Sequence, residues 1–197
     1  MAISPVSIGR MALSNIGDKS NIESLDEQST AARKISIWYD HARKQALEAF
    51  DWSFARKRQT LATHGDDPTT EWVYRYQLPS DCVAFRRIFN PLGEDAEPIP
   101  FDLEISTNGT LSILTNQADA IGVYTFDQTA CDLFSPIFVT ALSYLIAFYI
   151  CYDVTGKQDV KKGALETYIS LIRNAQTQNA NQKQKGPPRE ASWIAAR

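Results

Sequence analysis

The stretch LFSPIFVTALSYLIAFYICY, from Leu133 to Tyr152, decides how this chain must fold. It carries no formal charge over twenty residues, and Asp132 and Asp153 bracket it. Such a length would cross a membrane. However, Pro136 and several hydroxyl residues dilute the stretch, and neither flank has the Lys or Arg cluster that orients a span. We therefore predict a helix near residues 132–153, buried at the centre of a helical bundle. A small helical membrane-associated protein stays open as an alternative.

Two further helices are predicted ahead of this stretch, near residues 5–16 and 25–50. Ser4 and Pro5 form a typical helix start, and Gly17 supplies a left-handed stop. Ser24 and Glu27 match a capping box, which predicts that the second helix begins there. An apolar stripe then recurs at steps of three and four residues, formed by Ala31, Ile35, Trp38, Ala42, Ala46 and Ala49. Its small members would allow another helix to approach closely.

The segment between residues 52 and 127 has the pattern of a small antiparallel sheet. A period-two alternation that starts at Trp52 predicts the first strand, and further runs rich in aromatic and β-branched residues follow. Asn108-Gly109, between the apolar runs Leu103–Ile105 and Leu111–Ile113, is a strong hairpin signal. We expect the strands to be antiparallel because the connections between them are short.

The last part of the chain returns to helical patterning. Gly156 separates a final helix, near residues 157–180, and Gly186-Pro187-Pro188 ends it. The predicted fold class is α+β, mainly α: a helical bundle with an inserted small antiparallel β-domain and an extended C-terminal arm. The boundaries are 1–51 and 128–182 for the bundle helices, 52–127 for the β-domain and 183–197 for the arm.

Composition limits the function classes. The chain has 197 residues, of which 44% are hydrophobic and 22% charged, so it can bury a core. Its net charge of −3 argues against a surface that grips nucleic acid throughout. Three cysteines without CxxC spacing argue against a disulfide framework or a zinc cluster. The first residues lack the basic and apolar regions of a secretory signal, so we expect synthesis in a cytoplasm.

Signals for catalysis are weak. The sequence has no P-loop, GxGxxG, HExxH or GxSxG motif. The carboxylate pairs Asp66-Asp67 and Glu94-Asp95 lie in predicted loops, which cannot hold the geometry of acid/base catalysis. We therefore expect no enzyme, with a cell-wall hydrolase as a weaker alternative.

Other polar residues fit structural roles. We interpret His41 and His64 as ordinary helix and loop residues and Cys82 as a small buried side chain. The run from Arg56 to Arg58 beside aromatic residues is typical either of a nucleic-acid patch or of a helix-to-sheet junction. We favour the junction, because on one strand Arg56 and Arg58 share a face with Trp52 and Phe54 while Lys57 points to the opposite face.

The C-terminal tail is unusual in composition. From Lys183 onward it carries about +3 of charge, against about −6 for the rest of the chain. Trp193 and Ile194 follow Gly-Pro-Pro without a nearby core to join. Because Trp and Arg dominate interface hot spots, we predict a docking segment.

The order of these segments resembles the phage head-to-tail adaptor proteins of the tail tubular protein A type. The matching stretches are ALSNIGDKSNIESLDE (12–27), AFDWSFARKRQTLA (49–62), YRYQLPSDCVAFRRI (74–88) and the final EASWIAAR (190–197). No single motif is diagnostic, but their succession covers most of the chain. Residues 90–129 match only in pattern.

The resemblance implies a structural virion protein of the tail or neck, made in the host cytoplasm. It implies a dodecameric ring between the portal protein and a distal tail protein, a nozzle or stopper, with genomic DNA passing non-specifically through the lumen. It implies no cofactor, no metal and no membrane. The sheet domain is expected at the tail-facing end of the ring.

Two sets of residues are expected to make the contacts of that ring. The arm is expected to bind the portal through Pro187, Pro188, Arg189, Trp193, Ile194 and Arg197. Subunit contacts are expected on the second and last helices, at Ile35, Trp38, Tyr39, Ala42, Tyr168 and Ile172.

Overall fold

The computed structural model describes residues 3–65, 71–92 and 97–182 of the chain. In this part the α-helices are α1 (Pro5–Asn15), α2 (Thr30–Glu48), α3 (Pro136–Thr155) and α4 (Gln158–Gln182). The strands are β1 (Arg56–Thr60), β2 (Tyr74–Gln77), β3 (Cys82–Ile88), β4 (Phe101–Ile105), β5 (Leu111–Thr115) and β6 (Ile121–Phe126). Two short 3₁₀ turns, η1 (Ser53–Ala55) and η2 (Cys131–Leu133), precede β1 and α3. The predicted α+β class is confirmed.

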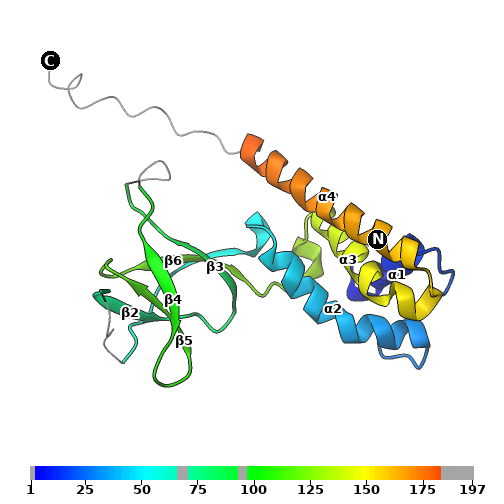
Figure 1. The fold of residues 1–197 in the computed structure, drawn as a ribbon, viewed down its shortest axis with the longest axis horizontal. Helices are drawn as coiled ribbons and strands as arrows, with labels where there is room; N and C mark the ends of the chain where they lie inside the picture. The colour runs from blue at the N-terminus through cyan, green and yellow to red at the C-terminus, as the bar shows by residue number, and fades with distance from the viewer. Residues whose placement is uncertain (1–2, 66–70, 93–96, 183–197) are drawn as a thin grey trace, which may run out of the picture.

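Helix α3 is the centre of the helical unit, because α1, α2 and α4 all pack against it (Figure 1). It begins later than predicted, at Pro136, where the missing N–H of proline costs nothing. It ends where Gly156, with a φ of +68°, supplies the left-handed stop. By length and composition α3 could cross a membrane, but in this structure 56% of its most apolar window is buried among other parts of the chain.

The connection between α1 and α2 differs from the prediction. Helix α2 begins at Thr30, with the Ser29 side chain accepting the Ala32 N–H, and not near residue 25. The Glu27 carboxylate instead accepts the backbone N–H of Glu23 and closes a separate turn. Ser24 and Glu27 therefore do accept backbone N–H groups, but they close a turn ahead of α2 and do not cap the helix.

Two three-stranded antiparallel sheets lie beside the helical unit, with strand orders β1-β6-β3 and β2-β5-β4 (Figure 1). Thr63 pairs with Tyr76, so the chain passes from the first sheet directly to the edge of the second. The predicted hairpin joins β4 to β5, and Gly109 takes a φ of +76° at its turn. The first strand starts at Arg56 and not at Trp52, because Trp52 packs into the helical core and donates its indole N–H to the Ala46 carbonyl.

The buried apolar residues form two principal clusters. The larger one unites α1, α2, α3 and α4 with Trp52 and Ala55. The smaller one lies between the two sheets and consists of Leu61, Tyr76, Ile88, Ile113 and Ala120. We refer to these two parts below as the helical unit and the sheet unit.

Candidate assembly surfaces

The residues predicted for subunit contacts lie mostly inside the protomer. The buried ones, none of them more than 8% exposed, are Ile35, Tyr39, Ala42, Tyr168 and Ile172. They pack in the cluster that unites the four helices. They therefore hold the protomer together, and a second subunit would have to contact the side chains around them. Periodicity identifies an apolar face but does not say whether the chain itself covers it.

The sixth of these residues, Trp38, is half-buried and stacks on Tyr149 of α3, with ring centroids 4.4 Å apart and planes at 4°. His41 stands edge-on to both rings at 5.8 and 5.6 Å, and Phe148 lies 5.2 Å from Tyr149. We call Trp38, His41, Phe148 and Tyr149 the aromatic cluster. Aromatic pairs in this geometry contribute about 0.5–1.5 kcal/mol each beyond their buried area.

Polar contacts fix the aromatic cluster at both ends. The Tyr149 hydroxyl donates to the Gln45 side chain at 2.6 Å, and Lys34 pairs with Asp153 at 2.6 Å. The position of the cluster on α2 and α3 is thus held by contacts on either side. Close by, burial together with Tyr149 raises the pKa of Tyr168 to about 12.

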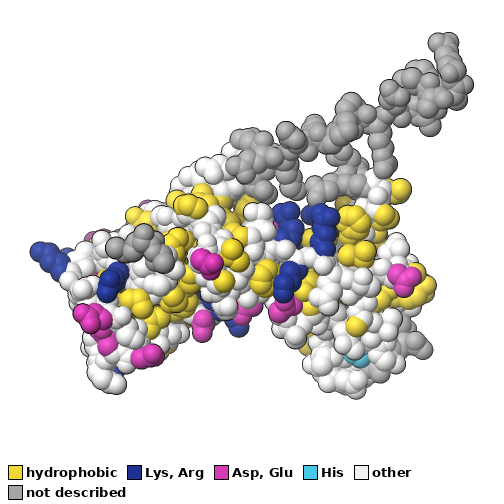
Figure 2. All heavy atoms as spheres, turned by 180° about the vertical axis from the view of Figure 1, so that it is seen from behind, with side chains coloured by type: hydrophobic (Ala, Val, Ile, Leu, Met, Phe, Trp, Pro, Cys, Tyr) yellow, Lys and Arg dark blue, Asp and Glu magenta, His cyan; other side chains and the backbone are white. Residues whose placement is uncertain are grey.

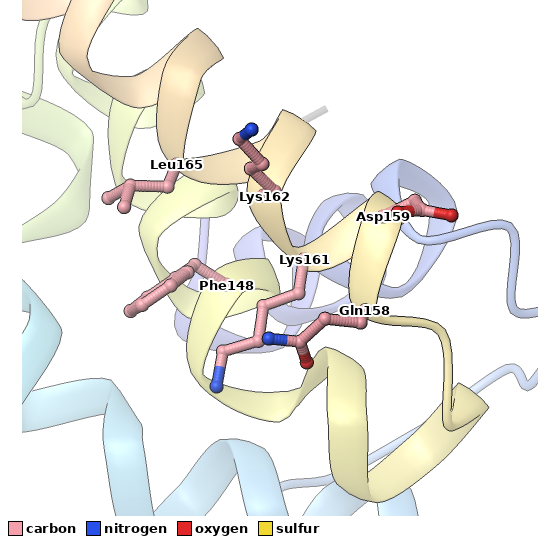
Figure 3. Close-up of a pocket in the computed structure, with 6 residues that line it drawn as sticks. All are labelled: Phe148, Gln158, Asp159, Lys161, Lys162 and Leu165. Carbon is pink, nitrogen blue, oxygen red and sulfur yellow. The ribbon is translucent and has the colours of Figure 1, made fainter.

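A groove continues this surface toward α4. Phe148, Leu165 and the head of Lys161 point to the same side of the α3–α4 pair (Figure 3). They line, with Gln158, Asp159 and Lys162, a pocket of about 260 Å³. The Lys161 ammonium lies 5.0 Å from the Phe148 ring centroid.

Exposed apolar side chains extend the same face. Tyr152 on α3 is 59% exposed and Ile169 on α4 is 40% exposed. An exposed apolar patch with a polar rim is typical of a protein-binding surface. Sequence reasoning missed Phe148, Tyr149 and Leu165, because a helix apolar on all sides suits the centre of a bundle as well as a subunit interface.

The junction between the helical unit and the sheet unit is tied by arginines. Arg86 on β3 donates to the carbonyls of Leu47, Glu48 and Phe50, which satisfies the C-terminal end of α2. Burial lowers the pKa of Arg86. These bonds make the sheet unit a direct continuation of α2.

A second buried arginine completes the junction. Arg43 is 3% exposed, pairs with Asp127 and donates to the Gln128 carbonyl at 2.9 Å. Burial alone would lower the pKa of Arg43, but its contacts with Asp127 and Asp40 outweigh burial and raise it.

The basic run at the start of β1 belongs to this junction. Arg56 pairs with Asp51 at 2.9 Å, and Lys57 pairs with Asp81 at 2.6 Å. Arg58 lies over the Phe89 ring at 5.0 Å. Seen from behind, Lys and Arg side chains gather where the two units meet (Figure 2). These contacts are what a helix-to-sheet junction requires, as we favoured from the sequence.

The structure brings few reactive groups together. Burial and Asp81 raise the pKa of Cys82 to about 11, so its thiol is protonated at neutral pH. Among residues 3–65, 71–92 and 97–182, no group of three or more His, Cys, Asp or Glu could hold a metal ion. His41 belongs to the aromatic cluster, and His64 lies 3.4 Å from the Thr110 hydroxyl.

Several predicted residues are beyond what the structure describes. The carboxylate pairs Asp66-Asp67 and Glu94-Asp95 lie outside the described residues. The same holds for the predicted portal-binding residues Pro187, Pro188, Arg189, Trp193, Ile194 and Arg197.

Comparison of the chain with models of known protein families and with curated proteins gives no match. In the described part of the chain, the helical unit carries a groove lined by Phe148 and Leu165, and the sheet unit carries edge strands.

Proposed function

We propose that this chain is a structural virion protein, a head-to-tail adaptor that assembles as a ring, expected to be dodecameric, between the portal and a distal tail protein. The protomer is a helical bundle with an inserted small β-domain and an extended C-terminal arm. Neither catalysis nor a cofactor is part of the proposal. The ring lengthens the channel through which genomic DNA passes.

The observation that carries the proposal is the uncovered groove on the helical unit. Phe148 and Leu165 line it, and Tyr152 and Ile169 extend it while substantially exposed. Burying such a surface between copies of the chain is favourable at about 25 cal/mol per Å² of apolar area. Ring subunits offer two unlike faces, so a groove on one copy can receive a helix of the next. The resemblance of residues 12–27, 49–62, 74–88 and 190–197 to adaptors agrees with this role.

Charge agrees with the same role. A net charge of −3 gives the chain no overall attraction for DNA phosphates, and each phosphate contact would add affinity through counterion release. A channel protein must let DNA slide, so weak binding suits it.

The first experiment measures the mass of the full chain alone and mixed with a purified portal ring. We expect a ring-sized species with the portal. Leu165→Asp and Ile169→Asp should reduce it about tenfold or more, because the first places a charge in the groove and the second places one on the apolar surface beside it. Glu166→Ser, on the exposed side of the same helix, is the matched control and should assemble like wild type. A chain that requires detergent to stay in solution would instead favour the membrane-associated alternative.

The second experiment concerns the arm. Deleting residues 187–197 should leave the far-ultraviolet circular dichroism spectrum and the melting temperature close to wild type. It should abolish attachment to portal-bearing heads, because a buried Trp anchor is commonly worth about 2 kcal/mol or more per subunit. Attachment and DNA retention at wild-type levels would refute the arm as the portal anchor and leave the contact to the helical unit.

A further inference from the structure

Strands β1 and β4 are both edge strands, and they belong to different sheets. In the orders β1-β6-β3 and β2-β5-β4, each of them pairs with one neighbour only. An edge strand presents unpaired N–H and C=O groups and is a template for a strand of another chain. Figure 1 shows β4 at the front of the sheet unit, while the basic side chains of the junction are seen from behind in Figure 2.

Both edges are accessible. Every residue of β1 after Arg56 is exposed. On β4, Ile105 is 67% exposed and Leu103 is 39% exposed, and Leu111 opposite Ile105 is 42% exposed. Proteins usually protect an exposed apolar edge with charged residues, proline or a covering element. Strand β4 instead leaves its apolar side chains exposed at the end near the hairpin turn.

The two edges carry opposite charges. Strand β1 reads RKRQT, with three cations and no acid, and β4 reads FDLEI, with two acids and no cation. Like charges opposite one another destabilise a strand pair, and opposite charges stabilise it. Two copies of β1 therefore repel each other, two copies of β4 repel each other, and β1 attracts β4.

Internal ion pairs leave one charge on each edge. Lys57 and Arg56 are paired within the protomer, and Glu104 pairs with Arg75 at 3.3 Å. Within the described part of the chain, Arg58 and Asp102 have no ion-pair partner, although Arg58 lies over the Phe89 ring and the Asp102 carboxylate accepts the backbone N–H of Leu103 at 2.7 Å. They are the charges that an incoming strand would meet.

We propose that β1 of one copy adds to β4 of the next copy, which joins the sheets of neighbouring subunits edge to edge. This inference rests on the proposed ring and adds a second contact beside the groove of the helical unit. The contact is head-to-tail, so it propagates around a ring, which two-fold pairing cannot do. Main-chain hydrogen bonds between the two edges supply affinity, and the side chains at alternate positions give specificity.

Charge reversal tests the pairing. Arg58→Glu and Asp102→Arg should each weaken ring assembly about tenfold, measured by sedimentation velocity and electron microscopy of the full chain, on the portal ring where the chain alone is monomeric. Mixing the two variants should restore assembly, because copies that alternate in the ring again place opposite charges across every contact between β1 and β4. Lys19→Glu and Asp26→Arg, exposed and outside the strands, are the matched controls.

Cross-linking distinguishes the geometry. In a Cys82→Ser background, since Cys82 is a half-buried free thiol, a short bis-maleimide should link Arg58→Cys/Asp102→Cys chains into a ladder of multimers, whereas Arg58→Cys or Asp102→Cys alone should give no ladder. Covalent dimers of Asp102→Cys alone would show that β4 pairs with its own copy and would overturn the proposal. Rings that form normally with Arg58→Glu alone and with Asp102→Arg alone would also overturn it and leave the adaptor function standing. If wild type forms no ring with or without the portal, the adaptor function fails, and this inference fails with it.

Discussion

The helical unit and the sheet unit bury their apolar side chains in different ways. The helical unit packs ring against ring, with Phe138 edge-on to Trp52, Phe54 and Phe134. The sheet unit has a smaller cluster of five buried apolar residues, with Leu114, Val123 and Tyr124 also buried, and it adds polar ties such as the Tyr76 hydroxyl donating to the Gln117 carbonyl at 3.0 Å. The difference teaches that apolar burial dominates the stability of one unit, whereas hydrogen bonds and charge contribute a larger share in the other.

Phe138→Ala should have the largest effect on stability. Its side chain is fully buried at the meeting point of three aromatic rings, so truncation should cost about 3–5 kcal/mol of unfolding free energy. Urea denaturation followed by tryptophan fluorescence measures it, because Trp52 lies in this core. Leu133→Ala, at a side chain 55% exposed, is the control and should change stability by less than about 0.5 kcal/mol. Equal effects of both would contradict the view of a tightly packed helical core.

Ile113→Ala makes the same comparison in the sheet unit. Ile113 is fully buried between Tyr76 and Leu103 in the β2-β5-β4 sheet. We expect a loss of about 2–3 kcal/mol, at the lower end for such a truncation, because a small core relaxes more easily around the cavity. The same urea denaturation, followed by circular dichroism, measures it. A loss larger than that of Phe138→Ala would reverse the ranking of the two units.

Arg86→Met tests whether the two units depend on each other. The substitution keeps the aliphatic stem but removes the donors to three carbonyls at the end of α2. We expect a loss of about 2 kcal/mol, measured by thermal and urea unfolding, since bonds to charged donors are worth about 1.5–3 kcal/mol. Fluorescence and circular dichroism transitions should separate in this variant, because the junction no longer couples the units. Transitions that stay superimposed would show that other contacts are enough to couple the two units. Arg33→Met, on the exposed face of α2, is the control.

Asp81→Asn should have the smallest effect, and the effect should depend on pH. The Asp81 carboxylate accepts Lys57 Nζ at 2.6 Å and the Tyr124 hydroxyl at 3.1 Å, and Lys57 holds its pKa below the usual value. A lowered folded-state pKa stabilises the protein above the unfolded pKa of about 3.9, and the benefit is lost as pH falls through the folded value. We expect about 0.5–1 kcal/mol at pH 7, reduced by solvent screening, and almost none at pH 2. An equal loss at both pH values would mean that the ion pair is not the cause.

Much of the fold follows from local sequence. The Asn108-Gly109 turn and the stop at Gly156 depend on backbone geometry that these residues dictate, whereas the start of α3 at Pro136 was predicted near residue 132. The start of α2 and of β1 does not follow, because tertiary contacts decide both. Trp52 belongs to a period-two pattern that predicts a strand, yet its side chain packs in the core of the helical unit.

Less of the candidate surface could be predicted. The apolar stripe on α2 was predicted, but its buried members pack inside the protomer. Of the stripe, only Trp38 belongs to the aromatic cluster. Phe148 on α3 and Leu165 on α4 line the same groove. The periodicity of one helix predicts its apolar face but not how it packs against another helix, so the groove could not be predicted. Which strands lie at the edges depends on their order within each sheet. The order of the strands along the chain does not determine that.

The central place of α3 has a consequence for the order of folding during synthesis. Helices α1 and α2 are complete at Glu48, but their packing partner α3 is complete only at Thr155, 107 residues later. At about 5–20 residues per second, the ribosome needs about 5–20 s to close that gap. During this interval α1 and α2 expose the apolar faces that α3 later covers, while the strands between α2 and α3 emerge one after another. The sheet unit can therefore fold first, and the emergence of the apolar helix α3 then completes the rest of the molecule.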